Sequence, residues 1–405
     1  MYSKSNSKLS RKALIFSFSI LPFMLNIALI DFMIPIKYDV ILENLPFFGF
    51  LVTLAWLASS FLDFAVGDLT DRIGVKKTLR IGVVLSFIGA LIFAVSSNFL
   101  TMTFGIFIWG LSYVMMTVPS DTYVFSKFPK NYRGSAYGIM YFLHDLAYAS
   151  APLLGYFIVT LFSINAAIVS AAIISLFTLP LLFVVEGKAR ENTINGMEDV
   201  IVKDGIIRKG LKDLLKMDKK ELSLLFNMFI CGLWFMTTLI GAPLLFFHEN
   251  RNLLNGALLA FSFMLPIAMF DLIWGRLSNS IKNRKIMINL GLIFSIILLV
   301  IFYFTQNFLL LLVLAFFITL CANMAWVASE VYVSEYLPKG RKGEFMGIFA
   351  SGKDLGFDLA PLFYGLLAVF GLKIPFLISG ILLFLAWLFF NFSWKKDNNQ
   401  NNKND

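Results

Sequence analysis

Eight ionisable side chains fall deep inside long apolar stretches, where they could carry protons or recognise a charged solute. An ionisable group far from a membrane interface costs about 2.5–3.5 kcal/mol on insertion scales, so each is a functional candidate by default. The residues are Asp31, Asp63, His144, Asp145, Asp271, Lys353, Asp354 and Asp358.

The apolar stretches around these residues determine the fold class. The chain has 405 residues, of which 59% are hydrophobic and 15% are charged, whereas soluble domains carry about 25% charged residues. A membrane helix needs about 20 apolar residues, which predicts an all-α membrane protein with about twelve transmembrane helices. The predicted spans are 13–36, 46–67, 78–97, 99–121, 134–160, 164–186, 222–247, 253–275, 285–305, 308–332, 343–370 and 373–394.

Basic residues predict the orientation of these spans. The apolar run from Ala13 to about Ile36 is too long for a signal peptide, so it is expected to stay as the first membrane helix. Lys and Arg cluster on one side of the predicted membrane, except for Lys37, Arg251, Lys353 and Lys373. Such clusters mark the cytoplasmic side. We expect a multi-pass protein of the inner or plasma membrane with both termini in the cytoplasm.

One long polar segment divides the chain. We expect an N-terminal six-helix bundle (1–186), a cytoplasmic linker (187–221), a C-terminal six-helix bundle (222–394) and a disordered tail (395–405). Within the linker, apolar residues at helical spacing predict a basic amphipathic helix along the inner leaflet; they are Ile207, Leu211, Leu214 and Leu215. The segment could serve as a tether or, alternatively, as a regulatory element.

The two predicted halves repeat each other. Gly134 and Gly343 stand 209 residues apart, as do Asp145 and Asp354, and Asp63 precedes Asp271 by 208 residues. Matching Leu or Ile residues in apolar segments arise easily by chance, but matching charges at membrane depth do not. The chain is therefore expected to be duplicated, with two parallel six-helix halves, an arrangement found in secondary transporters.

A charged turn joins the second and third predicted spans. Gly67 and Gly74 allow a sharp bend of the backbone, Asp71 and Arg72 stand where a helix ends, and the cytoplasmic side is marked by Lys76 and Lys77. A degenerate copy follows at 275–285, in which Asn279 replaces the acidic residue.

This turn resembles the signature loop of the major facilitator superfamily, and Pro129 with Arg133-Gly134 agrees with that family. Val75 departs from the family pattern, which has a basic residue after Gly74. The resemblance implies the fold of that family, with two pseudo-symmetric six-helix bundles, and a loop in which Asp71 and Arg72 fasten the bundles on the cytoplasmic side. Asp121 would then be the partner of Arg72. In the alternative reading, these charges only anchor the turn at the headgroups.

The resemblance also implies two gate pairs. In the family, helix 2 packs against helix 11 and helix 5 against helix 8. Asp63 would then face Lys353, and Asp271 would face His144. These pairs would close the cytoplasmic side, or would alternatively be static ion pairs that make buried charges tolerable.

Four carboxylates are candidates for binding protons or substrate: Asp31, Asp145, Asp354 and Asp358. At 1.5 Å per residue, Asp145 and Asp354 lie about 16 Å from the cytoplasmic ends of their helices. Asp31 lies one turn before Pro35 in the first helix. Desolvation disfavours the charged form of a carboxyl group, which suits a proton carrier. A counter-charge for a cationic substrate is the alternative.

Several functional classes are not supported by the sequence. There is no phosphate-binding glycine loop, the two histidines cannot form a metal cluster, and no nucleophile constellation suggests an enzyme. No cofactor, metal or nucleic acid is expected as a partner.

The sequence favours a monomeric secondary active transporter in a lipid bilayer, which moves a small solute by alternating access with protons as coupling ions. Residues 149–155 (ASAPLLG) partly resemble the glycine–proline element of drug/proton antiporters, which weakly favours a drug or metabolite exporter. The alternatives are an importer of a sugar, amino acid or organic anion, and a non-transporting membrane sensor or assembly protein.

Overall fold

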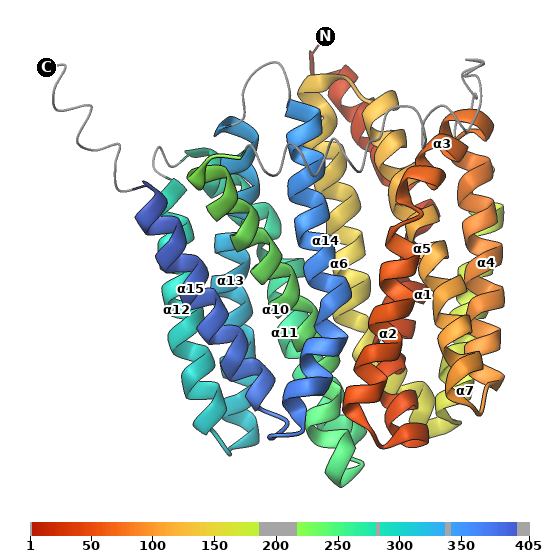
Figure 1. Ribbon diagram of the computed structural model, residues 1–405. Helices are drawn as coiled ribbons and strands as arrows, with labels where there is room; N and C mark the ends of the chain where they lie inside the picture. The colour runs from red at the N-terminus through yellow and green to blue at the C-terminus, as the bar shows by residue number, and fades with distance from the viewer. Residues whose placement is uncertain (1, 186–216, 281–283, 337–341, 395–405) are drawn as a thin grey trace, which may run out of the picture. The chain divides into compact units, whose positions relative to one another are not determined.

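The computed structural model describes residues 2–185, 217–280, 284–336 and 342–394 (Figure 1). Every regular element in these ranges is a helix, so the predicted all-α fold is confirmed. The helices are α1 (Tyr2–Leu42), α2 (Leu45–Ser60), α3 (Asp63–Ile73), α4 (Val75–Val95), α5 (Phe99–Lys127), α6 (Lys130–Leu161), α7 (Ile164–Leu176), α8 (Thr178–Leu181), α10 (Lys219–Asn250), α11 (Leu253–Ser280), α12 (Arg284–Phe304), α13 (Phe308–Tyr336), α14 (Lys342–Ala368) and α15 (Ile374–Trp394).

Ten of the helices among the described residues are long and apolar enough to cross a membrane. Helices α2 and α3 meet at a bend of 43°. If this bent pair is counted as one span, it is the eleventh. Helix α14 is not among the ten; its central part carries Lys353, Asp354 and Asp358. The prediction of many transmembrane helices is confirmed, whereas the number twelve is not.

The chain divides into two compact units. The first contains α1 to α8 together with Leu239–Ala268, which form the end of α10 and the beginning of α11. The second contains the rest of α10 and α11 with α12 to α15. The expected division into two six-helix bundles, with the linker between 187 and 221, stays a prediction. The amphipathic positions of the linker and the tail at 395–405 lie outside the described residues.

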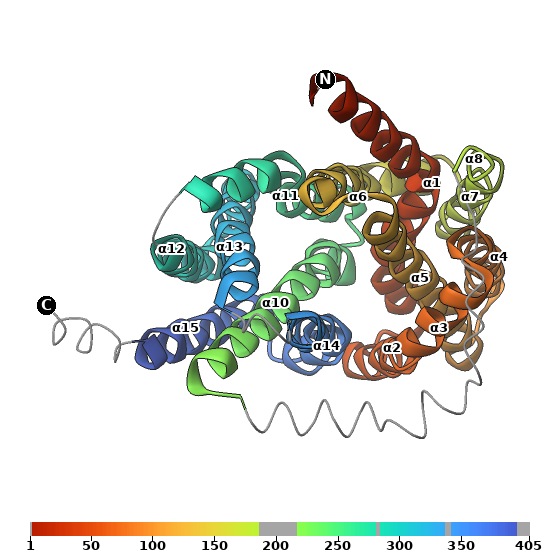
Figure 2. The ribbon, with the colours of Figure 1, turned by 90° about the horizontal axis from the view of Figure 1, so that it is seen from above.

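Within the first unit, α4 packs along α5 and α7, and α1 packs along α6 and α7 (Figure 2). Helices α4 and α5 approach closely because Gly82 has no side chain. A Cβ atom at Gly82 would lie 2.9 Å from the Cβ of Met115. Small residues allow such close contacts between membrane helices.

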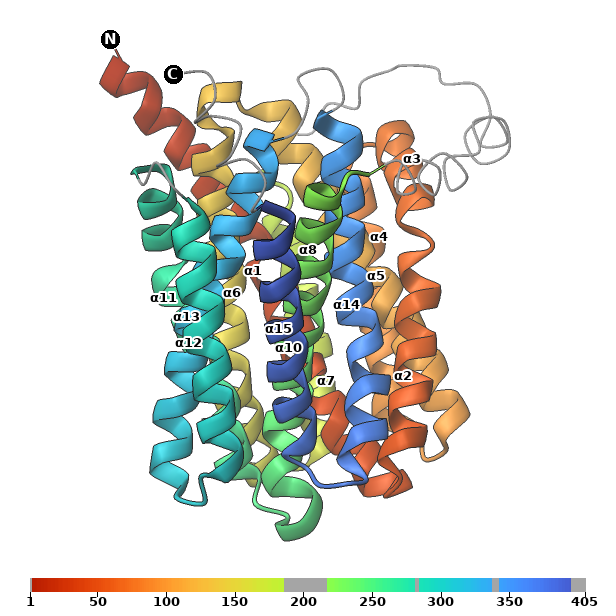
Figure 3. The same ribbon diagram turned by 60° about the vertical axis from the view of Figure 1, so that its left-hand side comes forward.

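Within the second unit, α12 packs against both α13 and α15 (Figure 3). Gly291 stands at the α12–α13 contact, where an added Cβ would lie 2.5 Å from the carbonyl oxygen of Cys321. Gly291 follows Gly82 by 209 residues. The two units therefore use an equivalent glycine at an equivalent helix crossing, which supports the internal repeat.

Asparagine side chains cap the first turn of four helices. Asn44 caps α2 by accepting from the amide of Phe47, and Asn98 caps α5 by accepting from that of Thr101. Asn252 and Asn307 accept in the same way from Asn255 and Leu310. An N-cap side chain satisfies one free amide of the first helical turn. Asn44 and Asn252 are 208 residues apart, and Asn98 and Asn307 are 209 apart, so the repeat extends to the helix caps.

The predicted charged turn is a single residue long. Helix α3 ends at Ile73 and α4 begins at Val75, with Gly74 between them at φ 85° and ψ 151°. Gly67 lies inside α3, so the expectation that it helps to form the turn is wrong. Helix α3 continues through Gly67 to Ile73, and Gly74 is the residue of this segment with a positive φ. In the second copy, α11 likewise continues through Gly275 to Ser280, and 281–283 lie outside the described residues.

Candidate functional site

Asp31 lies in the interior of the first unit. Its side chain projects from α1, and only 5% of the residue is exposed. The hydroxyl of Tyr148, on α6, donates a hydrogen bond of 2.6 Å to Oδ2 of Asp31. Among the described residues no ion pair to Asp31 occurs. A buried carboxyl group thus has a neutral phenol as its hydrogen-bond partner.

Helix α6 continues this polar path along one face. The ring of His144 lies 4.8 Å from that of Tyr148, and Nδ1 of His144 lies 3.2 Å from Oδ1 of Asp145. Tyr141 and Tyr137 follow at helical spacing, with the Tyr141 ring 6.2 Å from His144. Residues three and four apart share a helix face. The structure thereby brings together Asp31, His144 and Asp145, three of the predicted candidates.

In the second unit, Lys353 belongs to an aromatic cluster. Its ammonium lies 5.8 Å from the centroid of the Trp326 ring and 5.7 Å from that of Phe357. Such cation–π contacts stabilise a partly desolvated cation. Asp354 follows Lys353 on α14 and is half-buried, and Asp358 is buried one turn further on.

The two predicted gate pairs, Asp63 with Lys353 and Asp271 with His144, each join residues of different units and stay predictions. Within its own unit, Asp271 accepts a hydrogen bond of 2.6 Å from Nδ2 of Asn323. Asp63 is the first residue of α3. A carboxylate is favoured at a helix N-terminus, so the bend between α2 and α3 gives Asp63 a local role as well.

The predicted loop residues have specific contacts in the first unit. Nε of Arg72 lies 2.8 Å from Oδ2 of Asp68, one turn earlier on α3. The ammonium of Lys76 donates to the carbonyl oxygens of Phe183 and Val185, at 3.3 and 3.4 Å. Lys76 thus ties the turn to the end of the sixth span.

The other predicted residues of the charged turn and its partner differ in their exposure to solvent. Asp71 and Lys77 are exposed, and Asp121 is half-buried near the end of α5. The pairing of Arg72 with Asp121 stays a prediction. Sequence reasoning missed Asp68, although an acidic residue four positions before a basic one is a known helix pair.

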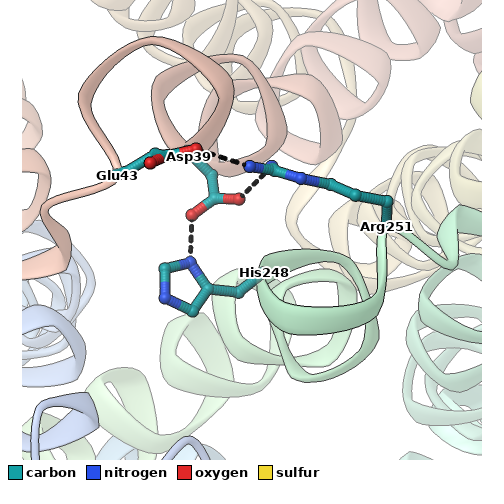
Figure 4. A network of polar contacts seen from close by, with 4 residues as sticks. All are labelled: Asp39, Glu43, His248 and Arg251. Carbon is teal, nitrogen blue, oxygen red and sulfur yellow. Dashed lines mark hydrogen bonds and ion pairs between the residues drawn. The ribbon is translucent and has the colours of Figure 1, made fainter.

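A second polar network was also missed. It lies at the end of α1 opposite the N-terminus and includes residues of α10 (Figure 4). Nδ1 of His248 hydrogen-bonds Oδ1 of Asp39, and Nη1 of Arg251 lies 2.8 Å from Oδ2 of Asp39. Nη2 of Arg251 lies 2.9 Å from Oε1 of Glu43. All four residues belong to the first unit.

The sequence carries a signal that could have revealed this network. Glu43 and Arg251 stand 208 residues apart, and each directly precedes an asparagine N-cap of the repeat. Equivalent positions of the two halves therefore hold opposite charges. Arg251 was also one of the four exceptions to the clustering of basic residues.

Two more of these exceptions bind the carbonyl ends of helices. The ammonium of Lys37 donates to the carbonyl oxygens of Phe93 and Ala94 at the end of α4, the latter at 2.6 Å, and to Oδ1 of Asn165 at 2.9 Å. Lys373 donates to the carbonyl of Thr305 at the end of α12. The last carbonyls of a helix lack partners within the helix and favour a cation.

Among the described residues, no group of three His, Cys, Asp or Glu side chains is arranged to hold a metal ion. What the arrangement can do is bind and release protons on buried carboxyl groups and form or break ion pairs at helix ends.

Comparison with known families gives one match along the chain. A sequence profile described as Major Facilitator Superfamily matches residues 16–261 and 224–405. Two curated relatives align over part of the chain. "Uncharacterized MFS-type transporter MJ1560" of Methanocaldococcus jannaschii is 30% identical over 169 residues, which cover 40% of this chain and 43% of that protein. "Multidrug resistance protein MdtG" of Rahnella sp. is 30% identical over 142 residues, which cover 35% and 34%. The matches thus span less than half the length of either relative.

Solved structures share the fold over almost the whole chain. A mutant form of the nucleoside transporter NupG superposes with a TM-score of 0.75 at 14% identity, covering 95% of this chain and 100% of that one. A D-xylose-proton symporter superposes with a TM-score of 0.71 at 18% identity, covering 94% and 97%. At such identities the likeness shows the fold alone.

Proposed function

Because the chain belongs to the major facilitator superfamily of membrane transporters, we propose that it moves a small solute by alternating access, with protons as the coupling ions. It acts as a monomer in the inner or plasma membrane, with both termini in the cytoplasm and without a catalytic step. The proposal extends the family assignment in three respects: the coupling ion, the residue that carries it and the class of solute.

The hydrogen bond between Asp31 and Tyr148 is the observation that carries the coupling proposal. A carboxylate removed from water costs several kcal/mol unless an opposite charge compensates it. The partner of Asp31 is a phenol hydroxyl 2.6 Å away, which can donate to the carboxylate but brings no positive charge. Asp31 is therefore suited to exchange a proton with water when the surrounding helices move apart.

His144 and Asp145 extend the proposed proton path. They stand within one turn of Tyr148 on α6, and the three side chains touch in sequence. A histidine can accept and donate a proton between about pH 5 and 8. We assign proton uptake to Asp31 and its transfer to His144 and Asp145, with Asp354 and Asp358 as alternative carriers in the second unit.

We favour a drug or metabolite exporter over an importer. The partial relative MdtG is named as a multidrug resistance protein, and residues 149–155 partly match the glycine–proline element of drug/proton antiporters. There are two alternatives. One is an importer of a sugar, amino acid or organic anion, and the other is a non-transporting membrane sensor or assembly protein. The neighbours named for a nucleoside and for D-xylose share the fold and nothing more specific.

The charged turn and the gate pairs complete the proposal. Asp71, Arg72 and Asp121 fasten the two bundles on the cytoplasmic side, and Asp63 with Lys353 and Asp271 with His144 part when that side opens. If Lys353→Ala changed neither transport nor the cysteine accessibility of helices α2 and α14, the gate role would be excluded.

The coupling proposal is tested in vesicles that contain the purified protein and a pH-sensitive dye. Ethidium, tetraphenylphosphonium, D-xylose and uridine are added in turn across an imposed pH gradient. The expected result is that an organic cation dissipates the gradient. Asp31→Asn should abolish this proton movement while the protein still binds the cation, as measured by thermal stabilisation.

Matched controls are Asp145→Asn and Asp354→Asn, which neutralise the other candidates. Proton movement that survives Asp31→Asn but disappears in one of these variants would move the carrier to that residue. If no probe moved protons and none stabilised the protein, the sensor reading would replace the transporter proposal.

A further inference from the structure

The network of Asp39, Glu43, His248 and Arg251, which we call the outer latch, joins the two halves of the sequence. It connects the end of α1 with the end of α10 (Figure 4). The Asp39 side chain is completely buried, whereas that of Arg251 is 44% exposed. The buried carboxylate is thus held from one side by two residues that come from the other half of the chain.

We propose that the outer latch is a sensor of external pH, in which protonation of His248 holds the outer ends of α1 and α10 together and its deprotonation favours their separation. The inference rests on the proposed alternating access and on the cytoplasmic position of the N-terminus. It adds a regulatory site that lies apart from Asp31.

The charges around His248 determine the sign of the response. Asp39 and Glu43 contribute two negative charges and Arg251 contributes one positive charge, so the latch carries an excess negative charge while His248 is neutral. Protonation of His248 balances the four side chains and converts its bond to Asp39 into an ion pair. Charge-assisted hydrogen bonds are about twice as strong as neutral ones, so external acid stabilises the closed latch.

The other ionisable groups near His248 are either hydrogen-bonded to other partners or exposed, so we assign the response to pH to His248. On α1, the ammonium of Lys37 is bound to carbonyls of α4 and to Asn165, and the hydroxyl of Tyr38 bonds Thr103. On α10, Glu249 is exposed. Histidine is the side chain whose charge normally changes between about pH 5 and 8.

Backbone strain at the latch is a second, independent observation. Glu43 has φ 47° and Arg251 has φ 52°, and these are the only non-glycine residues with positive φ in the described part of the chain. Each directly follows the end of its helix, α1 or α10, a position that glycine usually occupies because side chains disfavour left-handed backbone. The two charged residues that form the ion pair are thus held in strained conformations. Such strain is characteristic of switch regions.

A distance measurement between the outer ends of α1 and α10 tests the inference. In a background with Cys231→Ala and Cys321→Ala, spin labels are attached at Val40→Cys and Asn250→Cys, both at exposed positions. The protein is placed in lipid nanodiscs without any solute. We expect the population with the short distance to rise severalfold as the pH falls from about 8 to about 5.

The matched control is a substitution of Glu249, the exposed residue that follows His248 on α10. His248→Gln keeps a hydrogen-bond donor but no ionisable group, and should make the short-distance population independent of pH. Glu249→Gln removes an exposed ionisable group beside His248 and should keep the response. Asp39→Asn should reduce the short-distance population at every pH. Arg251→Glu alone should also reduce it, and the double variant Glu43→Arg with Arg251→Glu, which exchanges the two charges, should have a larger short-distance population than Arg251→Glu alone.

A response that persists in His248→Gln, or a parent protein whose distances do not depend on pH, would overturn the proposal. The measurement requires neither solute nor proton gradient. Failure of the latch would therefore leave the coupling role of Asp31 standing, and a failed vesicle assay would leave the latch testable.

Discussion

The basic side chains that break the positive-inside pattern each have a defined contact. Lys37 and Lys373 bind the carbonyl ends of α4 and α12, Arg251 pairs with Asp39, and Lys353 lies over two aromatic rings. Lys and Arg are enriched in the cytoplasmic loops of membrane proteins, so a basic residue elsewhere needs another reason for its position. Such exceptions in a membrane sequence therefore point to residues with specific partners.

Lys37 gives a prediction at this scale. Lys37→Met removes the donor to two backbone carbonyls and to Asn165, leaving buried acceptors without a partner, which costs about 1–3 kcal/mol. We expect a lower melting temperature of the purified protein, followed by intrinsic tryptophan fluorescence. Lys219→Met is the control, because Lys219 is exposed at the start of α10 and its replacement should leave the melting temperature unchanged. An equal effect of the two substitutions would contradict the capping role.

At the scale of the elements, the turn between α3 and α4 shows how a family motif is realised in one chain. Its two glycines have different roles, since Gly74 adopts φ 85° and ψ 151° while Gly67 is helical. Backbone of the first kind is accessible almost only to glycine. A shared motif therefore does not imply a shared structural reason for each of its residues.

The difference between the two glycines is testable. Gly74→Ala should destabilise the protein by about 1–3 kcal/mol, because alanine is strained in that backbone conformation. Gly67→Ala should be neutral or stabilising by about 0.5–1 kcal/mol, since the nearest atom to an added Cβ, Cγ1 of Val118, is 4.0 Å away. Fluorescence-detected gel filtration after heating measures both. Equal losses of folded protein would contradict the different roles of the two glycines.

At the scale of the whole molecule, the proposed orientation can be tested at the two ends of one helix. In the background without Cys231 and Cys321, Ser97→Cys and Ser126→Cys place a thiol at either end of α5, both at exposed positions. A membrane-impermeant maleimide applied to intact cells should label position 97 and not position 126. Permeabilised cells supply the control, in which both should react. The reverse pattern would place the termini outside and would turn the outer latch toward the cytoplasm.

Properties that follow from the sequence of each segment alone could be predicted. Long apolar runs need lipid and form helices, so the all-α membrane fold was predictable, and charges that recur at a shift of 208 or 209 residues revealed the duplication. The same reasoning identified the ionisable residues at membrane depth, because an ionisable residue inside a long apolar run can be recognised without knowing which side chains surround it in the fold.

Tertiary structure decided which of these residues meet. Tyr148 stands 117 residues after Asp31 and His248 stands 209 after Asp39, and no periodicity specifies that these side chains should touch. The two helices that meet at the bend, α2 and α3, likewise both pack against α5, which lies more than 25 residues further along the chain. Hydropathy and charge act on each segment separately, so the sequence by itself determined the helices, their repeat and the candidate charges. Hydrogen bonds need two groups within about 3 Å, so only the folded chain determined the Asp31–Tyr148 pair and the outer latch.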